Sequence, residues 1–428
     1  MIKINWFDDS IKDKDGKIIR EKYAEKISAK IIKHIKREKT TESFNEKNYF
    51  PPDIAVLFVD NGSLSENKIQ DFLKMSFNQV LEKEALKNYI DRRFLLLRCL
   101  KNVNKKDYDK WSENTKKNSI TDYLNEKFKE YKQKYPDYSL EYFKDQKTPE
   151  WKNDFKSVLS ENVLYESYND FFDYKKVDDK LRHELMSALN IPVCPFCNRQ
   201  YITSWDYIED EEEEVKVKST ADLDHFFPKI DYPLFALSLF NFVPSCQVCN
   251  SRMKLDNFMD DDGNRPIYPY DESFDDTVVF KPSVLAAGEK AKKLLEVWLG
   301  ENTEDLKIEL DYGQKDNESE LTDYQKHVKR SIELYHLKEV YQAHKMYVSE
   351  LMLKRRIYDD GEYLKGLQRI FQKSDTDDID ETSTYRLIDT DIIITKKQLE
   401  AFLYGYNWED GQDKTRPLSK LAYDILKR

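Results

Sequence analysis

The chain has 428 residues, a formal net charge of −11 and 35% charged residues. It is long enough for several domains, and it is too acidic for a protein coated in basic side chains for non-specific polyanion binding. An aromatic content of 13% favours a folded chain over a disordered one. No apolar run approaches the roughly 18–20 residues that span a bilayer, and residues 1–8 lack the apolar segment of a signal peptide. We therefore expect a cytoplasmic protein with no membrane partner.

Turn-forming residues are scarce, with 10 Gly and 13 Pro, which favours helices over a many-stranded sandwich. We expect a mainly α protein of the α+β class. Three regions are predicted: a helical N-terminal lobe at 1–185, a central metal-binding module at 186–275, and a helical C-terminal lobe at 276–428.

The N-terminal lobe carries no catalytic motif, and docking of a partner is one role open to it. Apolar residues at helical spacing predict a helix over 22–36, because Ile27, Ile31 and Ile35 lie on one face. The apolar run 54–59, between a Pro pair and Asp60-Asn61-Gly62, predicts a short buried strand. Further helices are predicted over 66–82, 84–103 and 119–134.

The C-terminal lobe is predicted to contain short strands near 278–280 and 306–310. A long helix is expected over 322–358, where apolar residues repeat at intervals of three and four. A terminal helix should begin around Pro417, because proline suits the first turn of a helix.

Four of the five cysteines form two Cys-x-x-Cys pairs, Cys194 with Cys197 and Cys246 with Cys249. Each pair can present two thiolates from one tight turn, and two pairs complete the tetrahedron that Zn²⁺ prefers. We predict a structural zinc site that joins the ends of a 48-residue insert, 198–245. The alternatives are a redox role for the cysteines, or two Cys-x-x-Cys pairs that are unrelated to each other and do not share a metal. The acidic segment 206–214 is expected to be the solvated tip of a loop or hairpin.

The insert and the second pair contain residues suited to phosphodiester chemistry. Asp224 offers a hard oxygen ligand for Mg²⁺ or Mn²⁺, and His225 offers a base near neutral pKa. Asn250 follows Cys249 at the expected start of a helix, where its amide oxygen would be a second ligand of the same metal. Arg252 and Lys254 follow on that helix, placed to meet phosphate.

The order of these motifs resembles that of the HNH, or ββα-metal, endonucleases of the four-cysteine zinc type. The order is Cys-x-x-Cys, Asp224-His225, Asn241 and Cys-x-x-Cys-Asn250. The resemblance implies that His225 is the general base that activates water, and that Asn241 orients it. It implies that Asp224 and Asn250 hold one catalytic divalent ion. Lys229, Arg252 and Lys254 are the candidates for contacts with nucleic acid.

A narrower resemblance covers roughly 180–428. Three segments are similar to segments of the HNH subunits of Septu and related retron anti-phage systems. They are Asp224-His225-Phe226-Phe227-Pro228-Lys229, Tyr268-Pro269-Tyr270 and Arg416-Pro417-Leu418-Ser419-Lys420-Leu421. In those systems the nuclease works with a separate ATPase of the SMC/ABC type. The resemblance implies an effector nuclease of bacterial anti-phage defence, acting on nucleic acid, with DNA favoured. The absence of a P-loop in this chain agrees with an ATPase supplied by a partner.

Two other functions remain open at this point. One is a zinc-stabilised nucleic-acid-binding or scaffold module without catalysis. The other is an HNH nuclease that acts on RNA, because active sites of this class contact mostly the backbone and the sequence does not settle the choice of sugar.

Overall fold

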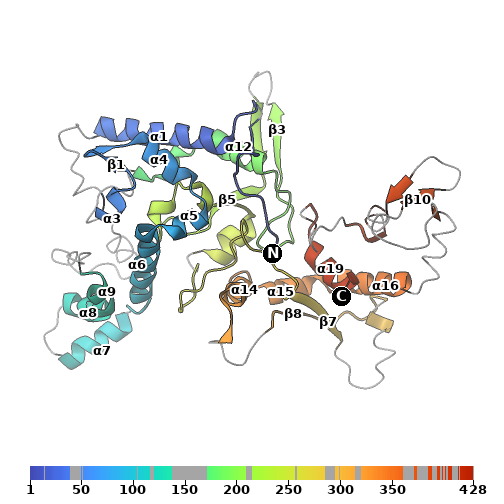
Figure 1. Cartoon of the computed structure of the whole chain (residues 1–428). Helices are drawn as coiled ribbons and strands as arrows, with labels where there is room; N and C mark the ends of the chain where they lie inside the picture. The colour runs from blue at the N-terminus through green and yellow to red at the C-terminus, as the bar shows by residue number, and fades with distance from the viewer. Residues whose placement is uncertain are drawn as a thin grey trace.

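The computed structural model of this chain describes residues 1–359 and 415–427, apart from several gaps. The gaps are 14, 39–49, 51, 104, 116–119, 137–170, 209–214, 256–257, 285–294, 298 and 314–319. Between 360 and 414 it describes 371–373, 384–387, 393–395, 398, 401, 403–406 and 413. The architecture is mainly α with small antiparallel sheets, as predicted (Figure 1).

The described part of the N-terminal region is built from helices and one minimal hairpin. Its elements are α1 (Ile19–Glu38), α3 (Pro52–Ala55), β1 (Val59–Asp60), β2 (Ser63–Leu64), α4 (Glu66–Lys74), α5 (Phe77–Glu82), α6 (Glu84–Lys101), α7 (Lys105–Thr115), α8 (Ile120–Lys127), α9 (Lys129–Lys134) and η3 (Tyr174–Lys176).

Two predictions for this region are corrected. The apolar run 54–59 is not a strand, since it begins within α3 and only its last residue belongs to β1. A short apolar run does not by itself distinguish a strand from a helix, and Pro52 favours a helix start. The predicted helix 66–82 is divided into α4 and α5, because Ser76 caps a new helix through a reciprocal pair of hydrogen bonds with Gln79.

The central region contains the elements that surround the cysteines. They are α12 (Asp179–Leu189), β3 (Ser204–Ile208), β4 (Val215–Ser219), β5 (Ala221–His225), η4 (Pro233–Phe235), η5 (Leu239–Asn241), β6 (Phe242–Cys246) and η6, a π-helical turn (Cys249–Lys254). β3 and β4 form an antiparallel hairpin, so the first three residues of the acidic segment, 206–208, belong to a strand and not to a hairpin tip. Residues 209–214 themselves lie outside the described residues.

The C-terminal region contains β7 (Val279–Val284), β8 (Leu306–Asp311), α14 (Asp323–Leu334), α15 (Leu337–Val340), η8 (Tyr341–His344), α16 (Lys345–Asp359), β9 (Phe371–Lys373), β10 (Thr384–Leu387), β11 (Ile393–Thr395) and α19 (Ser419–Lys427). β7 pairs with β8 in antiparallel register, which confirms the two predicted strands. The long helix predicted over 322–358 is interrupted, because His336 adopts a left-handed conformation (φ +47°) after α14. The terminal helix begins at Ser419, just after the predicted start.

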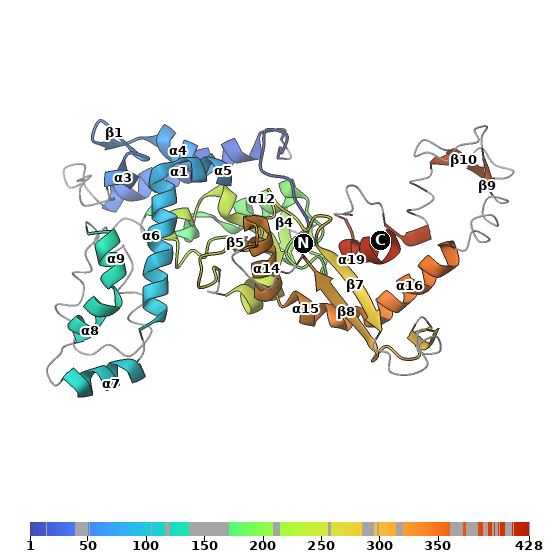
Figure 2. The same cartoon turned by 60° about the horizontal axis from the view of Figure 1, so that its bottom comes forward.

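A continuous hydrophobic core includes buried residues from all three predicted regions, from Ile27 of α1 through Phe226 to Leu421 of α19. A second, smaller core packs α6 against α8 and α9 and contains Cys99. Figure 2 shows α7–α9 at one end of the molecule and β7, β8, α16 and α19 toward the other. The three-region division stays a prediction, and the shared core means that these regions pack closely on one another.

Among the helices that the structure describes, none combines the length and the apolar character needed to cross a membrane.

Candidate metal centre and the adjoining cavity

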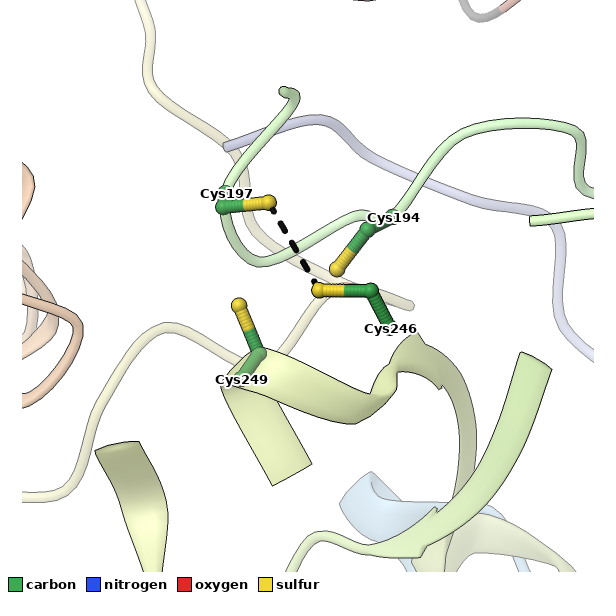
Figure 3. A group of neighbouring side chains, drawn as sticks. All are labelled: Cys194, Cys197, Cys246 and Cys249. Carbon is green, nitrogen blue, oxygen red and sulfur yellow. Dashed lines mark hydrogen bonds between the residues drawn. The ribbon is translucent and has the colours of Figure 1, made fainter. Parts of the chain in front are cut away.

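The two Cys-x-x-Cys pairs come together, as the sequence predicts. All four cysteines are buried, and their Sγ atoms lie within 4.8 Å of one another. Figure 3 shows the four side chains pointing toward a common centre, with a Sγ–Sγ distance of 4.0 Å between Cys197 and Cys246. A tetrahedral zinc with Zn–S bonds of about 2.3 Å requires sulfurs roughly 3.8 Å apart. Such a group could hold a metal such as zinc.

Local structure explains how each pair is presented. Cys194 and Cys197 lie in a tight turn closed by a hydrogen bond from the Asn198 amide to the Cys194 carbonyl (2.9 Å), with Asn198 in the left-handed region (φ +50°). Cys246 ends β6, and Cys249 begins η6. A bound Zn²⁺ would therefore hold the end of β6 and the start of η6 against the turn that carries Cys194 and Cys197.

The C-terminal region supports the first turn. The Tyr341 hydroxyl donates to the Cys197 carbonyl (2.8 Å), and the Asn198 side chain accepts from the Ser419 hydroxyl and the Lys420 amide (3.3 Å each). Asn198 thus accepts a hydrogen bond from a backbone N–H in the first turn of α19, where helical N–H groups have no acceptor within the helix. The sequence offered no indication of this link.

A cavity of about 720 Å³ adjoins the second pair and is lined by five of the seven predicted site residues other than the cysteines. Its lining includes Asp224, His225, Lys229, Asn250 and Lys254. Asn241 and Arg252 are not part of the lining. The lining also contains residues that the sequence analysis did not single out: Tyr174, Arg182, His183, Trp205, Lys218 and Asp222.

β5 and β6 carry the central part of this site. They pair antiparallel, with Asp224 opposite Val243 and His225 opposite Phe242. Alternate residues of a strand share a face, so Asp222 and Asp224 lie on the same side of β5. The Asn250 amide nitrogen donates to Asp222 (3.0 Å), which leaves the amide oxygen as the atom available to a cation. Asp222 could have been found from the sequence by this two-residue period.

His225 is held from three directions. Its Nε2 lies 3.0 Å from the Ala236 carbonyl oxygen, and the rings of Tyr174 and Phe242 contact the imidazole edge to face, with centroids 4.6 and 5.2 Å away. Because a carbonyl oxygen only accepts hydrogen bonds, Nε2 carries the proton, and the lone pair of the neutral ring is on Nδ1. Burial lowers the pKa of His225 to about 3, with Lys229 and Lys254 adding to the shift. The ring is therefore neutral at pH 7.

Asn241 has a different role from the one implied by the resemblance. It is fully buried, and its amide accepts from the Phe227 amide (2.6 Å) and donates to the carbonyls of Phe227 and Phe235 (3.0 Å each). The His225 ring donates instead to the Ala236 carbonyl. The Asn241 side chain holds the backbone of the loop that carries Ala236, so its effect on the orientation of His225 is indirect.

Helices of the N-terminal region brace the same loop. The Tyr23 hydroxyl of α1 donates to the Leu237 carbonyl (2.7 Å), and Arg93 of α6 donates to the Asp231 carbonyl (2.6 Å). Phe77 of α5 stacks on Phe240, with centroids 5.7 Å apart. A region without a recognisable motif therefore positions the loop that orients His225.

Lys254 is not placed to contact nucleic acid, which corrects the sequence-based prediction. Its side chain is 2% exposed, and its ammonium nitrogen lies 2.7 and 2.8 Å from the two carboxylate oxygens of Asp224 and also contacts the His225 carbonyl. Burial raises the pKa of Asp224 and lowers the pKa of Lys254, and the charge of each residue opposes the shift of the other. Arg252 is exposed and lies outside the lining of the cavity.

Replacing Lys254 with methionine should destabilise the fold by about 3–5 kcal/mol, because it leaves the Asp224 carboxylate buried without a compensating charge. Chemical denaturation measures this difference. A matched control is Lys281→Met, which removes an exposed ion pair with Asp311 and should cost about 0–1 kcal/mol. Adding Asp224→Asn to Lys254→Met should recover part of the loss. Equal stability of the wild type and Lys254→Met would contradict the buried ion pair.

Comparisons with known proteins give one partial similarity. The chain resembles Protein ea31 of Escherichia phage lambda, with 32% identity over 77 residues, which is 18% of this chain and 20% of that protein. The chain therefore matches about a fifth of the length of that relative. No family model and no solved structure matches the chain.

Proposed function

We propose that this protein is a metal-dependent HNH endonuclease that hydrolyses phosphodiester bonds of nucleic acid, with DNA favoured. The observation that carries the proposal is the orientation of His225 beside Asp222, Asp224 and Asn250 at one cavity. A neutral imidazole can serve as a general base, and carboxylate and amide oxygens can hold a divalent ion, so these groups are suited to hydrolysis of a phosphodiester.

In this proposal His225 is the general base. The Ala236 carbonyl fixes the proton on Nε2, so Nδ1 is the atom that accepts a proton from the attacking water. The ring is neutral at pH 7, which is the form that can accept a proton, but burial lowers its pKa to about 3 and so makes it a weaker base than the near-neutral histidine that the sequence predicts. The edge-to-face contacts with Tyr174 and Phe242 limit rotation of the ring, which reduces the cost of placing the base.

The oxygen donors at the cavity suit Mg²⁺ or Mn²⁺. Asp224 and Asn250 would hold the ion, as the resemblance implies, and Asp222 adds a carboxylate on the same face of β5. When bound, such an ion offsets the negative charge that develops on the phosphate oxygens during cleavage. Its binding requires the Lys254 ammonium to give up at least one oxygen of Asp224. Lys229, which is exposed at the cavity and lies over the Tyr174 ring, is the predicted residue still suited to a phosphate.

The wider role rests on the resemblance alone. We propose that the nuclease is an effector of bacterial anti-phage defence and that it works with a separate SMC/ABC-type ATPase. Zn²⁺ at the four cysteines would be structural in this scheme. Co-purification with an ATPase encoded nearby is the observation that would support the partner directly.

One observation favours the alternative of a zinc-stabilised binding or scaffold module without catalysis. Lys254 neutralises Asp224 within the folded chain and so occupies the carboxylate that a catalytic ion needs. In that alternative the ion pair is permanent, and the cavity binds nucleic acid without cutting it.

A cleavage assay distinguishes the nuclease from the non-catalytic binding module. Purified protein is incubated with plasmid, linear DNA and RNA in Mg²⁺, in Mn²⁺ and without divalent ions, alone and with the candidate ATPase. We expect divalent-dependent cleavage that is lost in Asp224→Asn, and the preferred polymer identifies the substrate. Binding without cleavage under all these conditions would favour the non-catalytic module.

A further inference from the structure

The β3–β4 hairpin forms one wall of the cavity and presents an exposed aromatic side chain there. Trp205 of β3 is 46% exposed and pairs directly across the hairpin with Lys218 of β4, and both residues line the cavity. Directly opposed residues of an antiparallel pair project to the same face of the hairpin. An indole and an ammonium group therefore stand side by side at the cavity wall.

The surroundings of Trp205 are unusual for a protein surface. Two other large apolar residues of the same cavity are also exposed, Ile230 at 63% and Leu255 at 56%. They come from the loop after β5 and from the end of η6, so three separate segments expose apolar side chains around one opening. A grouping of this kind indicates a binding surface, whereas single exposed apolar residues need no explanation.

Basic side chains of the lining come from α12, from the hairpin, from the loop after β5 and from η6: Arg182, Lys218, Lys229 and Lys254. Arg182 forms an ion pair with Asp179, and Lys254 forms one with Asp224. The acidic residues Asp222 and Asp224 lie on β5. Figure 1 shows the hairpin next to α12, with β5 close by. A polyanionic strand passing β5 would thus meet cations on several neighbouring segments.

Aromatic faces beside cations suit unpaired nucleotides. Proteins that bind single strands combine a cationic groove with aromatic side chains on which bases stack, and stacking is available to every base. In a duplex the base faces are covered by neighbouring base pairs, and only edges and backbone are presented to the protein. Trp205 can therefore use its ring face only on a nucleotide that has left a duplex or was never in one.

We propose that the β3–β4 hairpin receives an unpaired nucleotide beside the cleavage site, with Trp205 stacking on its base and Lys218 contacting its phosphate. This inference rests on the proposed nuclease function and deepens it. It makes the substrate single-stranded or locally unpaired nucleic acid.

The test measures binding separately from cleavage. Fluorescence anisotropy without divalent ions compares a labelled single strand of about 16 nucleotides, the upper end of the site sizes of single-strand binders, with the same strand in a duplex. DNA and RNA versions of each probe are used. The wild type should bind the single strand more tightly. Trp205→Ala should weaken single-strand binding roughly 5–100-fold and duplex binding less than about twofold, as expected for loss of one stacked base. Trp205→Phe should restore part of the affinity.

Two further variants sharpen the test. Tyr201→Ala is the matched control, because Tyr201 is 58% exposed on the segment before β3 but does not line the cavity. The affinity of the Tyr201→Ala protein for the single strand should equal that of the wild type. Lys218→Gln should reduce the slope of log affinity against log salt by about 0.7, the value for one phosphate contact on a single strand. Zinc content and thermal unfolding confirm that each variant is folded.

The outcomes distinguish this inference from the nuclease proposal. If Trp205→Ala weakens single-strand and duplex binding equally, or changes neither, the stacking role is overturned even where the wild type cleaves. If strand binding depends on Trp205 but neither Mg²⁺ nor Mn²⁺ gives cleavage with the partner present, the inference stands and the nuclease proposal fails.

Discussion

Replacing His225 with alanine should lower the rate of phosphodiester cleavage by about 10²–10⁴-fold, the usual contribution of general base catalysis, while zinc remains bound. In the proposed mechanism the buried, neutral imidazole is the general base, and its Nδ1 carries the lone pair because Nε2 faces the Ala236 carbonyl. The four cysteines lie outside this contact, so the substitution leaves the metal ligands intact. Initial cleavage rates and zinc content, measured on the same preparation, give both quantities.

The control for His225→Ala is His327→Ala. His327 is a partly buried histidine that hydrogen-bonds to Glu272 and does not line the cavity, so its removal tests the loss of an imidazole elsewhere in the fold. The cleavage rate of the His327→Ala protein should stay within a few-fold of the wild-type rate. Added imidazole should restore part of the activity of His225→Ala, because a small base can enter the space that the side chain leaves. A His225→Ala protein that cleaves at the wild-type rate would show that the base assignment is wrong.

Replacing Cys249 with serine should remove the bound zinc, lower the midpoint of thermal unfolding and abolish cleavage. Structural zinc sites contribute about 10–16 kcal/mol of binding free energy in small zinc-dependent folds, so losing one thiolate affects the whole module. Cys249 begins η6, which also carries Asn250 and Lys254, and both of these residues contact carboxylates of β5. Loss of the metal should therefore displace these side chains together.

Cys99→Ser is the matched control for Cys249→Ser. Cys99 is also buried, but it packs in the small core of α6, α8 and α9, away from the four-cysteine group. The Cys99→Ser protein should retain about one zinc per chain and remain active, although burying a hydroxyl group in the small core lowers its stability. Metal analysis and thermal unfolding report on both variants. A Cys249→Ser protein with full zinc content and unchanged stability would contradict a site built from these four ligands.

The sequence was sufficient for features that depend on spacing within short segments. The paired cysteines and the helical stripe of α1 are encoded by residues a few positions apart, and each has the expected arrangement. Element boundaries were less certain where a local signal competed with periodicity. Ser76 with Gln79 starts a new helix inside one apolar pattern, and the left-handed His336 interrupts another.

The functions of individual side chains at the site depended on contacts between distant segments. Lys254 lies 30 positions from Asp224, and only the packing of η6 against β5 turns this predicted phosphate contact into a buried ion pair. Asn241 reaches the backbone of Phe227 and Phe235 and not the His225 ring. Tyr23 and Arg93 of the N-terminal region hold the same loop by hydrogen bonds to its carbonyls.

The four cysteines, Asp224, His225 and Asn250 were identified from the sequence because their chemistry and spacing are visible in one dimension. Strand register and helix packing decided what each side chain contacts. Packing of η6 against β5 brought Asp222 to Asn250, since this contact forms only when separate segments are fixed against one another. The register of the β3–β4 hairpin set Trp205 opposite Lys218.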